Sequence, residues 1–277
     1  MTSDRKTHAR PFRGALFDLD GTLLDTETPC VEVIDQVVRK YLEQKREGAG
    51  SGDLSSWSWT DAKHAGIVGM RAVDWTRVVL LDAGLLEKSA VEVESQEMTE
   101  MQQQLVKDWE KDLGEWGYSQ AEWLPGAEVL TEKLHEELGV PICIATSSNK
   151  SAVAKKRIAR NGKNKAVFDR FGACIVTGED VSRGKPDPEI FAKAASRIGL
   201  SPDVCIAFED SPLGCDSARA AGCYVVAVPG RFGDPKNFEG RCDLILPDKG
   251  LHDFLTQGHF ENAFGEQSVK RRKVGNL

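Results

Sequence analysis

The most constraining feature of the chain is a short apolar run, residues 14–17, that is followed by Asp18, Leu19, Asp20 and Gly21. An apolar run of this length, ended by polar residues and a glycine, is typical of a strand buried in a parallel sheet. Side chains two residues apart on an extended chain point the same way, so both carboxylates are expected to face one crevice at the strand's carboxyl end. Open α/β sheets bind their ligands at that end.

Two simpler interpretations compete with a functional site at this acidic pair. A calcium loop of the Asp-x-Asp type is excluded because its sixth position holds Leu23 instead of glycine and its twelfth holds Pro29 instead of glutamate. A solvated turn is the commoner reason for two aspartates after a strand. The choice between a turn and a site therefore depends on what the rest of the chain brings to the same edge of the sheet.

Beyond residue 123, strand-like apolar runs alternate with segments of helical periodicity. Helices are expected over 127–138, 150–160, 188–198 and 213–221, and strands over 141–146, 173–177, 204–208, 224–228 and 243–246. Such alternation implies right-handed crossovers between parallel strands. The predicted fold class is therefore α/β, with a doubly wound parallel-sheet core that helices cover on both faces.

Three of the later strands lead into groups that a phosphate site needs. One ends at Thr146 and Ser147 just before a predicted helix, where a hydroxyl and free backbone amides can bind an anion, although plain capping would use the same groups. A second is followed by a loop that holds Lys185, whose ammonium can neutralise phosphoryl charge. A third ends at Glu209 and Asp210, which could also cap the following helix.

The segment 28–122 has helical periodicity and no strand pattern. Helices are expected over 31–42, 72–83 and 91–116, with a loop rich in Gly, Ser and charge over 45–56. Pro29 marks the entry to this segment, and Pro125 followed by Gly126 marks its exit. A helical bundle inserted on two linkers predicts a lid over the sheet.

These patterns give the predicted domain organisation of the chain. It consists of a disordered tail over 1–11, a core domain over 12–27 and 123–258, a helical cap domain over 28–122, and a C-terminal tail over 259–277.

Charge and composition narrow the classes of partner. A net charge of −7 argues against a general nucleic-acid binder, and no apolar run approaches the eighteen residues of a membrane span. The first ten residues lack the apolar core of a signal peptide.

The seven cysteines are odd in number, lack C-x-x-C spacing, and include Cys143, Cys174 and Cys205 inside apolar runs. This pattern favours reduced, buried thiols and a cytoplasmic location. A basic tetramer over 270–273 is interpreted as a solvated tail, with a nuclear address as the alternative.

The order Asp-x-Asp, Thr/Ser, Lys and Glu-Asp on successive strands or loops resembles the haloacid dehalogenase-like (HAD) hydrolase superfamily over roughly residues 12–247. The stretches 124–127, 145–148 and 184–188 look most like the pseudouridine-5'-phosphatase and FMN-hydrolase branches, followed by the β-phosphoglucomutase branch. The resemblance implies a Rossmann-like core, and the inserted helical segment matches in position the helical cap of the family's first cap class.

The chemistry of phosphate monoesters then gives each motif a role. Asp18 is expected to be the nucleophile that forms an aspartyl-phosphate, and Asp20 the acid that protonates the ester oxygen and later the base that deprotonates water. Thr146, Ser147 and Lys185 are expected to bind the phosphoryl oxygens. An aspartate at position 20 points to phosphate esters, since dehalogenases and phosphonate-cleaving relatives keep other residues there.

Two carboxylates that face a phosphate require a cation. Asp18, the backbone carbonyl of Asp20 and the carboxylate of Asp210 are hard oxygen ligands of the kind that Mg²⁺ prefers. Glu209 is expected to be either a further ligand or a partner of the ligands. The expected cofactor is therefore Mg²⁺.

Within the predicted cap, the segment 67–71 discriminates between a phosphatase and a phosphosugar mutase. β-Phosphoglucomutases carry a lysine just before the glycine of this segment and an arginine three residues after it, whereas this chain has Val68 and Ala72 there. The departure argues against mutase activity. Arg71 is the expected substrate contact of the cap, with a solvated arginine at a helix start as the alternative.

The sequence therefore predicts an Mg²⁺-dependent phosphatase that hydrolyses a small phosphomonoester, nucleotide- or sugar-phosphate-like, through an aspartyl-phosphate. The alternatives are a β-phosphoglucomutase-like phosphosugar mutase and a non-catalytic phospholigand-binding protein. The expected partner is a small phosphorylated metabolite, with no nucleic acid and no membrane, and the chain is expected to be a monomer or weak dimer.

Overall fold

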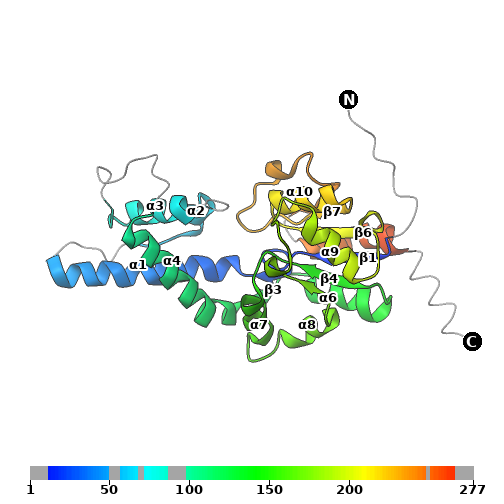
Figure 1. The fold of residues 1–277 in the computed structure, drawn as a ribbon, viewed down its shortest axis with the longest axis horizontal. Coiled ribbons are helices and arrows are strands. Elements are labelled where there is room, and N and C mark those ends of the chain that lie inside the picture. Colours follow the sequence, from blue (N-terminus) through cyan, green and yellow to red (C-terminus); the bar gives the residue numbers. More distant parts are fainter. Residues whose placement is uncertain (1–11, 50–56, 68–71, 87–97, 248–249, 266–277) are drawn as a thin grey trace, which may run out of the picture. The chain divides into compact units, whose positions relative to one another are not determined.

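The computed structural model describes residues 12–49, 57–67, 72–86, 98–247 and 250–265 of the chain (Figure 1). It divides into two compact units, which we call the core unit (Met1–Asp25 and Glu122–Leu277) and the helical unit (Thr26–Ala121). Arg71 and the predicted tail over 1–11 lie outside the described residues. That these units act as a catalytic core and a cap stays a prediction.

A six-stranded parallel sheet forms the centre of the core unit. Its strands are β1 (Gly14–Phe17), β4 (Ile142–Ala145), β5 (Ile175–Val176), β6 (Cys205–Glu209), β7 (Tyr224–Ala227) and β8 (Leu244–Ile245). They are hydrogen-bonded in the order β5-β4-β1-β6-β7-β8, and every pair is parallel. The chain winds outward from β1 in both directions, so the predicted doubly wound sheet is confirmed.

Alternate residues of the strands build two separate hydrophobic layers. Phe17 and Phe208 stack on one face at a ring separation of 4.9 Å, while Leu16 and Ala207 belong to the other face. The first face packs against residues of α6 (Ala127–Glu132), α7 (Lys150–Ile158), α8 (Lys165–Phe171) and α11 (Leu251–Thr256). The second packs against α9 (Glu189–Arg197) and α10 (Pro212–Ala221). Burial on both faces explains why these strands are almost wholly apolar.

The core unit contains elements that the sequence pattern did not indicate. A second, antiparallel sheet pairs β2 (Leu24–Asp25) with β3 (Glu122–Trp123), so residue 122 is extended and not part of a helical segment. Helix α8 was not expected either. The predicted C-terminal tail begins too early, because residues 259–265 are helical and bury Phe260 and Phe264 in the first hydrophobic layer.

Every regular element among the described residues of the helical unit is a helix. They are α1 (Glu27–Ala49), α2 (Asp61–Ala65), α3 (Ala72–Asp82), α4 (Glu100–Asp112), the π-helical turn η2 (Leu113–Gly117) and α5 (Tyr118–Gln120). Helix α1 continues into the segment over 45–56 that was predicted to be a loop, and residues 50–56 lie outside the described part.

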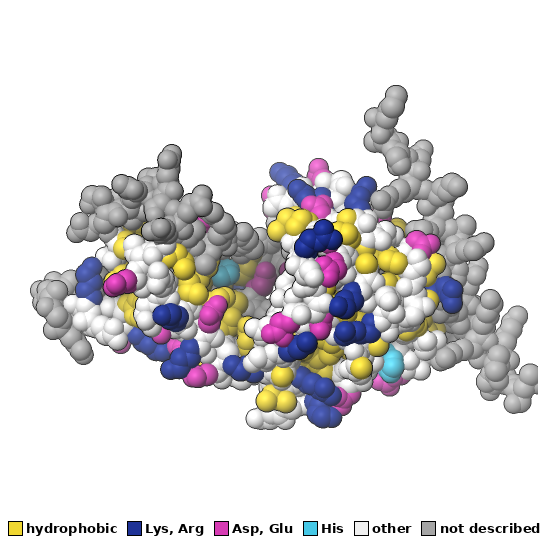
Figure 2. Space-filling model, viewed as in Figure 1, with side chains coloured by type: hydrophobic (Ala, Val, Ile, Leu, Met, Phe, Trp, Pro, Cys, Tyr) yellow, Lys and Arg dark blue, Asp and Glu magenta, His cyan; other side chains and the backbone are white. Residues whose placement is uncertain are grey.

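The described residues can also be compared with what the composition suggested about membrane spans, charge and cysteines. None of the described helices combines the length and the apolar character that crossing a membrane requires. On the face shown in Figure 2, acidic and basic side chains are interspersed over the core unit. The seven cysteines all lie within the described residues, and none of them forms a disulfide there. Cys143 and Cys205 are buried as expected, whereas Cys174 is only half-buried.

Candidate active site

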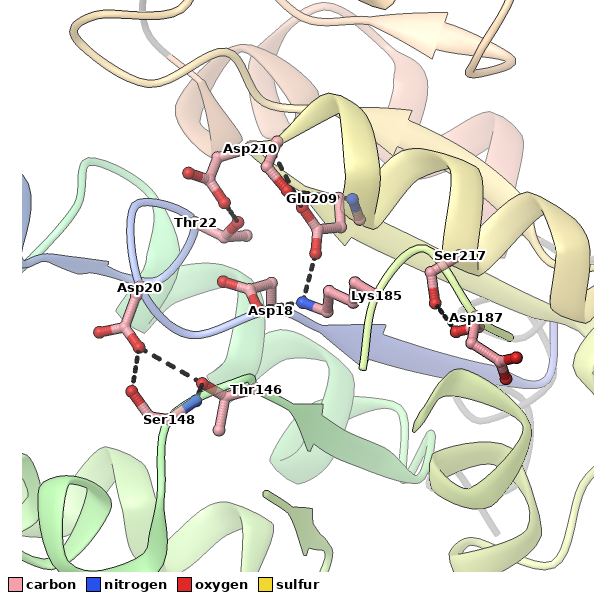
Figure 3. A network of polar contacts seen from close by, with 12 residues as sticks. Asp18, Asp20, Thr22, Thr146, Ser148, Lys185, Asp187, Glu209, Asp210 and Ser217 are labelled. Carbon is pink, nitrogen blue, oxygen red and sulfur yellow. Dashed lines mark hydrogen bonds and ion pairs between the residues drawn. The ribbon is translucent and has the colours of Figure 1, made fainter. Parts of the chain in front are cut away.

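The candidate site lies where the three adjacent central strands β4, β1 and β6 end (Figure 3). The backbone N–H of Asp18 donates to the carbonyl of Phe208 at 3.0 Å, which continues the β1–β6 ladder one residue beyond the strand. The N–H of Thr146 likewise donates to the carbonyl of Val176 at 2.9 Å. The sheet itself therefore fixes the backbone of Asp18 and Thr146, two of the predicted site residues.

Lys185 joins two of the predicted site residues in a buried cluster. Its Nζ donates to Oδ1 of Asp18 and to Oε1 of Glu209, at 2.5 Å in each case. The side chains of Lys185 and Asp18 are each 8 % exposed, and Glu209 is fully buried. The lysine comes from the loop between β5 and α9, so this cluster unites three segments that are distant in the sequence.

Burial and neighbouring charges in this cluster shift the pKa values of Asp18 and Lys185. Burial raises the pKa of Asp18 to about 7; the charges of Glu209 and Asp20 act in the same direction, and Lys185 opposes them. Burial alone lowers the pKa of Lys185, but its two carboxylate neighbours outweigh burial and hold it above its ordinary value. Additional positive charge near Asp18 would favour its ionised form, which is the form that can act as a nucleophile.

Glu209 is held in place by the start of α10. Its Oε2 accepts hydrogen bonds from both the N–H and the hydroxyl of Ser211, each at 2.9 Å. A Cβ on Gly214 would lie 1.9 Å from the Glu209 carboxyl carbon, so only glycine permits the helix to approach this closely. The capping role that the sequence allowed is therefore performed by Ser211, whose hydroxyl accepts from the Gly214 N–H at 3.1 Å.

Asp20 contacts a different set of partners from Asp18. Its Oδ2 accepts from the hydroxyls of Ser148 at 2.7 Å and Thr146 at 3.3 Å, and its Oδ1 accepts from Nζ of Lys156 at 2.5 Å. Figure 3 shows Asp20 directed toward Thr146 and Ser148, while Asp18 meets Lys185. The two carboxylates thus leave the same loop but have separate hydrogen-bond partners.

The serine that contacts Asp20 is not the one that the sequence singled out. Ser147 is exposed, whereas Ser148 is half-buried and bonds Thr146 through its N–H at 3.1 Å as well as Asp20 through its hydroxyl. The prediction for Ser147 concerned its backbone N–H toward a phosphate and stays a prediction. Ser148 and Lys156 were missed, although alternation along an extended chain places residue 148 on the side of Thr146.

Asp210 lies against the loop that follows β1. Thr22 Oγ1 donates to its Oδ1 at 3.0 Å, and a Cβ on Gly21, whose φ is +80°, would lie 2.3 Å from its Oδ2. This contact brings the Asp210 carboxylate beside the backbone that joins Asp20 to Gly21. A ligand set of Asp18, the Asp20 carbonyl and Asp210 is thus drawn from neighbouring chain segments.

The chemistry of these donors fits a hard divalent cation. Among the described residues, no group of three or more His, Cys, Asp or Glu side chains is gathered closely enough to hold a metal ion. The predicted set contains only two carboxylates, because its third oxygen is a main-chain carbonyl. In the polar network, four carboxylates (Asp18, Asp20, Glu209 and Asp210) outnumber two ammonium groups (Lys156 and Lys185), and Mg²⁺ would offset the resulting excess of negative charge.

Comparison with known proteins gives a consistent result. A family model described as haloacid dehalogenase-like hydrolase matches residues 12–222. A Saccharomyces cerevisiae protein named a probable pseudouridine-5'-phosphatase is 30% identical, with 88% of this chain and 93% of that protein covered. Hexitol phosphatase A of Escherichia coli is 31% identical, with 84% and 90% covered.

Solved structures reproduce the fold. A HAD family hydrolase from Deinococcus radiodurans, solved with bound phosphate and sodium, matches with a TM-score of 0.62 at 22% identity, covering 91% of this chain and 96% of that one. At this level of identity the likeness shows the arrangement of elements.

Proposed function

The chain belongs to the haloacid dehalogenase-like hydrolase family and is a phosphomonoester hydrolase, and from this premise we propose that Asp18 attacks a small nucleotide- or sugar-phosphate-like ester. The observation that carries the proposal is the position of Asp18 at the end of the central strand, 2.5 Å from the Lys185 ammonium, with Asp20 two residues further on. Relatives named for hexitol and pseudouridine phosphates support a small, polar leaving group.

In the first half of the reaction, an Asp18 oxygen attacks phosphorus and the bond from phosphorus to the ester oxygen breaks. Asp20 gives its proton to the departing oxygen, which leaves as an alcohol, and an aspartyl-phosphate remains. Lys185 balances charge on the transferring phosphoryl group. Thr146, which lies beside Asp20, contacts the same phosphoryl group.

In the second half, water attacks the phosphorus of the aspartyl-phosphate. Asp20, now a carboxylate, takes a proton from that water, the bond from phosphorus to Asp18 breaks, and inorganic phosphate leaves. Both aspartates return to their starting forms, so the net reaction consumes one ester and one water. Mg²⁺, when held by Asp18, the Asp20 carbonyl and Asp210, supplies positive charge toward the phosphoryl oxygens.

A panel of phosphate esters tests this function directly. The full chain, with Mg²⁺, is offered pseudouridine 5'-phosphate, FMN, hexose and hexitol phosphates, glycerol 3-phosphate and phosphoglycolate, and released phosphate is measured. We expect one ester to exceed the others clearly in kcat/KM. If none of the esters releases phosphate, the proposal is contradicted and a non-catalytic binding protein is favoured. The complete set of site residues argues against that alternative, because binding alone would not use all of them.

The phosphosugar mutase is the second candidate for the same core. Its support is the sequence resemblance to the β-phosphoglucomutase branch, and Val68 and Ala72 argue against it because they replace the family's phosphate-binding pair. A sugar bisphosphate added in trace amounts should activate a mutase. We expect no activation of this chain.

Selectivity among esters is expected to depend on the predicted cap, because the core motifs contact only the phosphoryl group. We predict that Arg71→Ala lowers kcat/KM strongly for the best natural ester and little for p-nitrophenyl phosphate. Lys185→Ala should lower both together, since each presents the same group to the ammonium. Equal losses for both substrates in Arg71→Ala would remove that residue as the selector, and melting curves of both variants control for misfolding.

A further inference from the structure

Lys156 is a buried charged residue for which the reaction above has no role. It lies near the end of α7, and its side chain is 1 % exposed. Its Nζ donates to Oδ1 of Asp20 at 2.5 Å and to the hydroxyl of Ser148 at 2.8 Å. The Ser148 hydroxyl in turn donates to Oδ2 of the same aspartate at 2.7 Å. These three side chains therefore form a closed triangle of polar contacts.

Burying an ammonium is unfavourable unless an anion and further hydrogen bonds compensate for lost water. The compensation here is asymmetric, because Asp20 keeps 29 % of its side chain exposed while Lys156 keeps almost none. The lysine is thus enclosed by protein, and the carboxylate to which it is bound still reaches solvent. The buried Lys156 can therefore hold the solvent-accessible carboxylate of Asp20 in one orientation.

The end of α7 holds the lysine in place. The Asn164 amide, itself 1 % exposed, donates to the carbonyl of Lys156 at 3.1 Å. The start of the helix is closed by Asn149, whose side chain accepts from the Ala152 N–H at 2.8 Å. Both ends of the helix are therefore tied down, and the ammonium is presented at a defined position.

The two aspartates of the site each have a lysine of their own, from different elements. Asp18 is paired with Lys185, which also serves Glu209, whereas Asp20 is paired with Lys156, whose second acceptor is a hydroxyl. Both oxygens of Asp20 are engaged, by Lys156 on one and by Ser148 and Thr146 on the other. Engagement of both oxygens restricts rotation of the carboxylate about its last side-chain bond.

We propose that Lys156 is a positioning residue for Asp20, which fixes the orientation of that carboxylate for proton transfer to the leaving group and from water. The inference rests on the proposed function, because it takes Asp20 as the acid and base. Lys156 itself touches neither substrate nor reacting atoms. Its removal should leave Asp20 held through one oxygen only and less restricted in rotation, so that fewer encounters have the proton aligned.

The central variant is Lys156→Met, which keeps an unbranched chain of similar length and removes the ammonium. Its matched control is Lys155→Met, because Lys155 is the preceding residue on the same helix and is exposed. On the best ester from the panel we expect Lys156→Met to lower kcat by roughly 10- to 100-fold, a part of the 10²- to 10⁴-fold that general acid–base catalysis supplies. KM should change little, and Lys155→Met should behave like the unaltered chain.

A second readout separates positioning from general damage to the fold. p-Nitrophenolate leaves without being protonated, so formation of the aspartyl-phosphate from p-nitrophenyl phosphate should be spared while its hydrolysis is slowed. Rapid mixing of Lys156→Met with this substrate should therefore show a burst of nitrophenolate larger than that of the unaltered chain. A fold defect would reduce burst and steady rate together.

The decisive measurement is a double-mutant cycle with Asp20→Asn. If Lys156 acts through Asp20, Lys156→Met should cost nothing further once Asp20 is replaced. Multiplication of the two losses would overturn the proposal. Should Lys156→Met fail to fold, Ser148→Ala takes its place in the cycle, because it opens the same triangle and leaves Lys156 paired with Asp20. Multiplication of the losses from Ser148→Ala and Asp20→Asn would overturn the proposal equally.

The outcomes also separate this inference from the proposed function. An unaltered chain that hydrolyses no ester would contradict the function itself. An unaltered chain that is active, together with a Lys156→Met variant that loses no kcat, would leave the function standing and reject the positioning role.

Discussion

Replacement of Asp18 by asparagine is expected to reduce kcat by at least about 10⁴-fold, as losses of a covalent nucleophile do in other enzymes. An amide cannot form the aspartyl-phosphate. The fold should survive, because the asparagine oxygen can still accept from Lys185, and the backbone N–H of residue 18 stays in the β1–β6 ladder. The measurement is phosphate release by Asp18→Asn beside the unaltered chain, with matched melting curves.

Mass spectrometry of acid-quenched reactions extends this test to the intermediate. The unaltered chain should carry a phosphoryl adduct on the peptide that contains Asp18, and the variant should not. A variant that retains a tenth of the original activity, or an adduct that maps elsewhere, would remove Asp18 as the nucleophile.

Removal of divalent cations should have a comparably large effect. Four carboxylates and two ammonium groups leave the polar network with an excess of negative charge, to which a phosphate ester would add more. We expect EDTA to stop turnover and excess Mg²⁺ to restore it. Ca²⁺ should inhibit, because its larger and looser coordination shell misplaces the nucleophile relative to phosphorus.

The control for this experiment is the melting curve of the chelated protein, which should show that the fold persists without added metal. Full activity in thoroughly chelated buffer would contradict the assignment of Asp18, the Asp20 carbonyl and Asp210 as ligands. Restoration by Ca²⁺ as well as by Mg²⁺ would contradict the argument from coordination geometry.

The central sheet could be predicted from sequence because its strands are buried on both faces and read as uninterrupted apolar runs. The pair β2 and β3 could not, since strands of two residues are too short to show any periodicity. Helix α8 follows a turn in which Arg160 and Asn161 both adopt positive φ, and an arginine gives no sequence signal for this uncommon conformation.

The positions of the site residues on the sheet were predictable, but their side-chain partners were not. Lys155, Lys156 and Arg157 form a continuous basic run, which in a sequence is typical of a solvated helix face. Only packing shows that the middle residue is buried and its neighbours are not. In the same way, alternation predicted that Asp18 and Asp20 share one edge, yet their orientations depend on lysines more than a hundred residues away.

The strand order has a consequence for how the protein is made. Strand β1 leaves the ribosome early, but Ala15 pairs with Ile142 on one side and Ile206 on the other, so the central strand waits for partners that are synthesised much later. The helical unit is translated in that interval and is a compact unit by itself, so it can fold first. Glu209, the second carboxylate that Lys185 contacts, is supplied only when β6 joins the sheet. A nascent chain that ends before residue 205 would therefore contain the nucleophile without a site around it, and the exposed apolar strand would be open to chaperones and to aggregation.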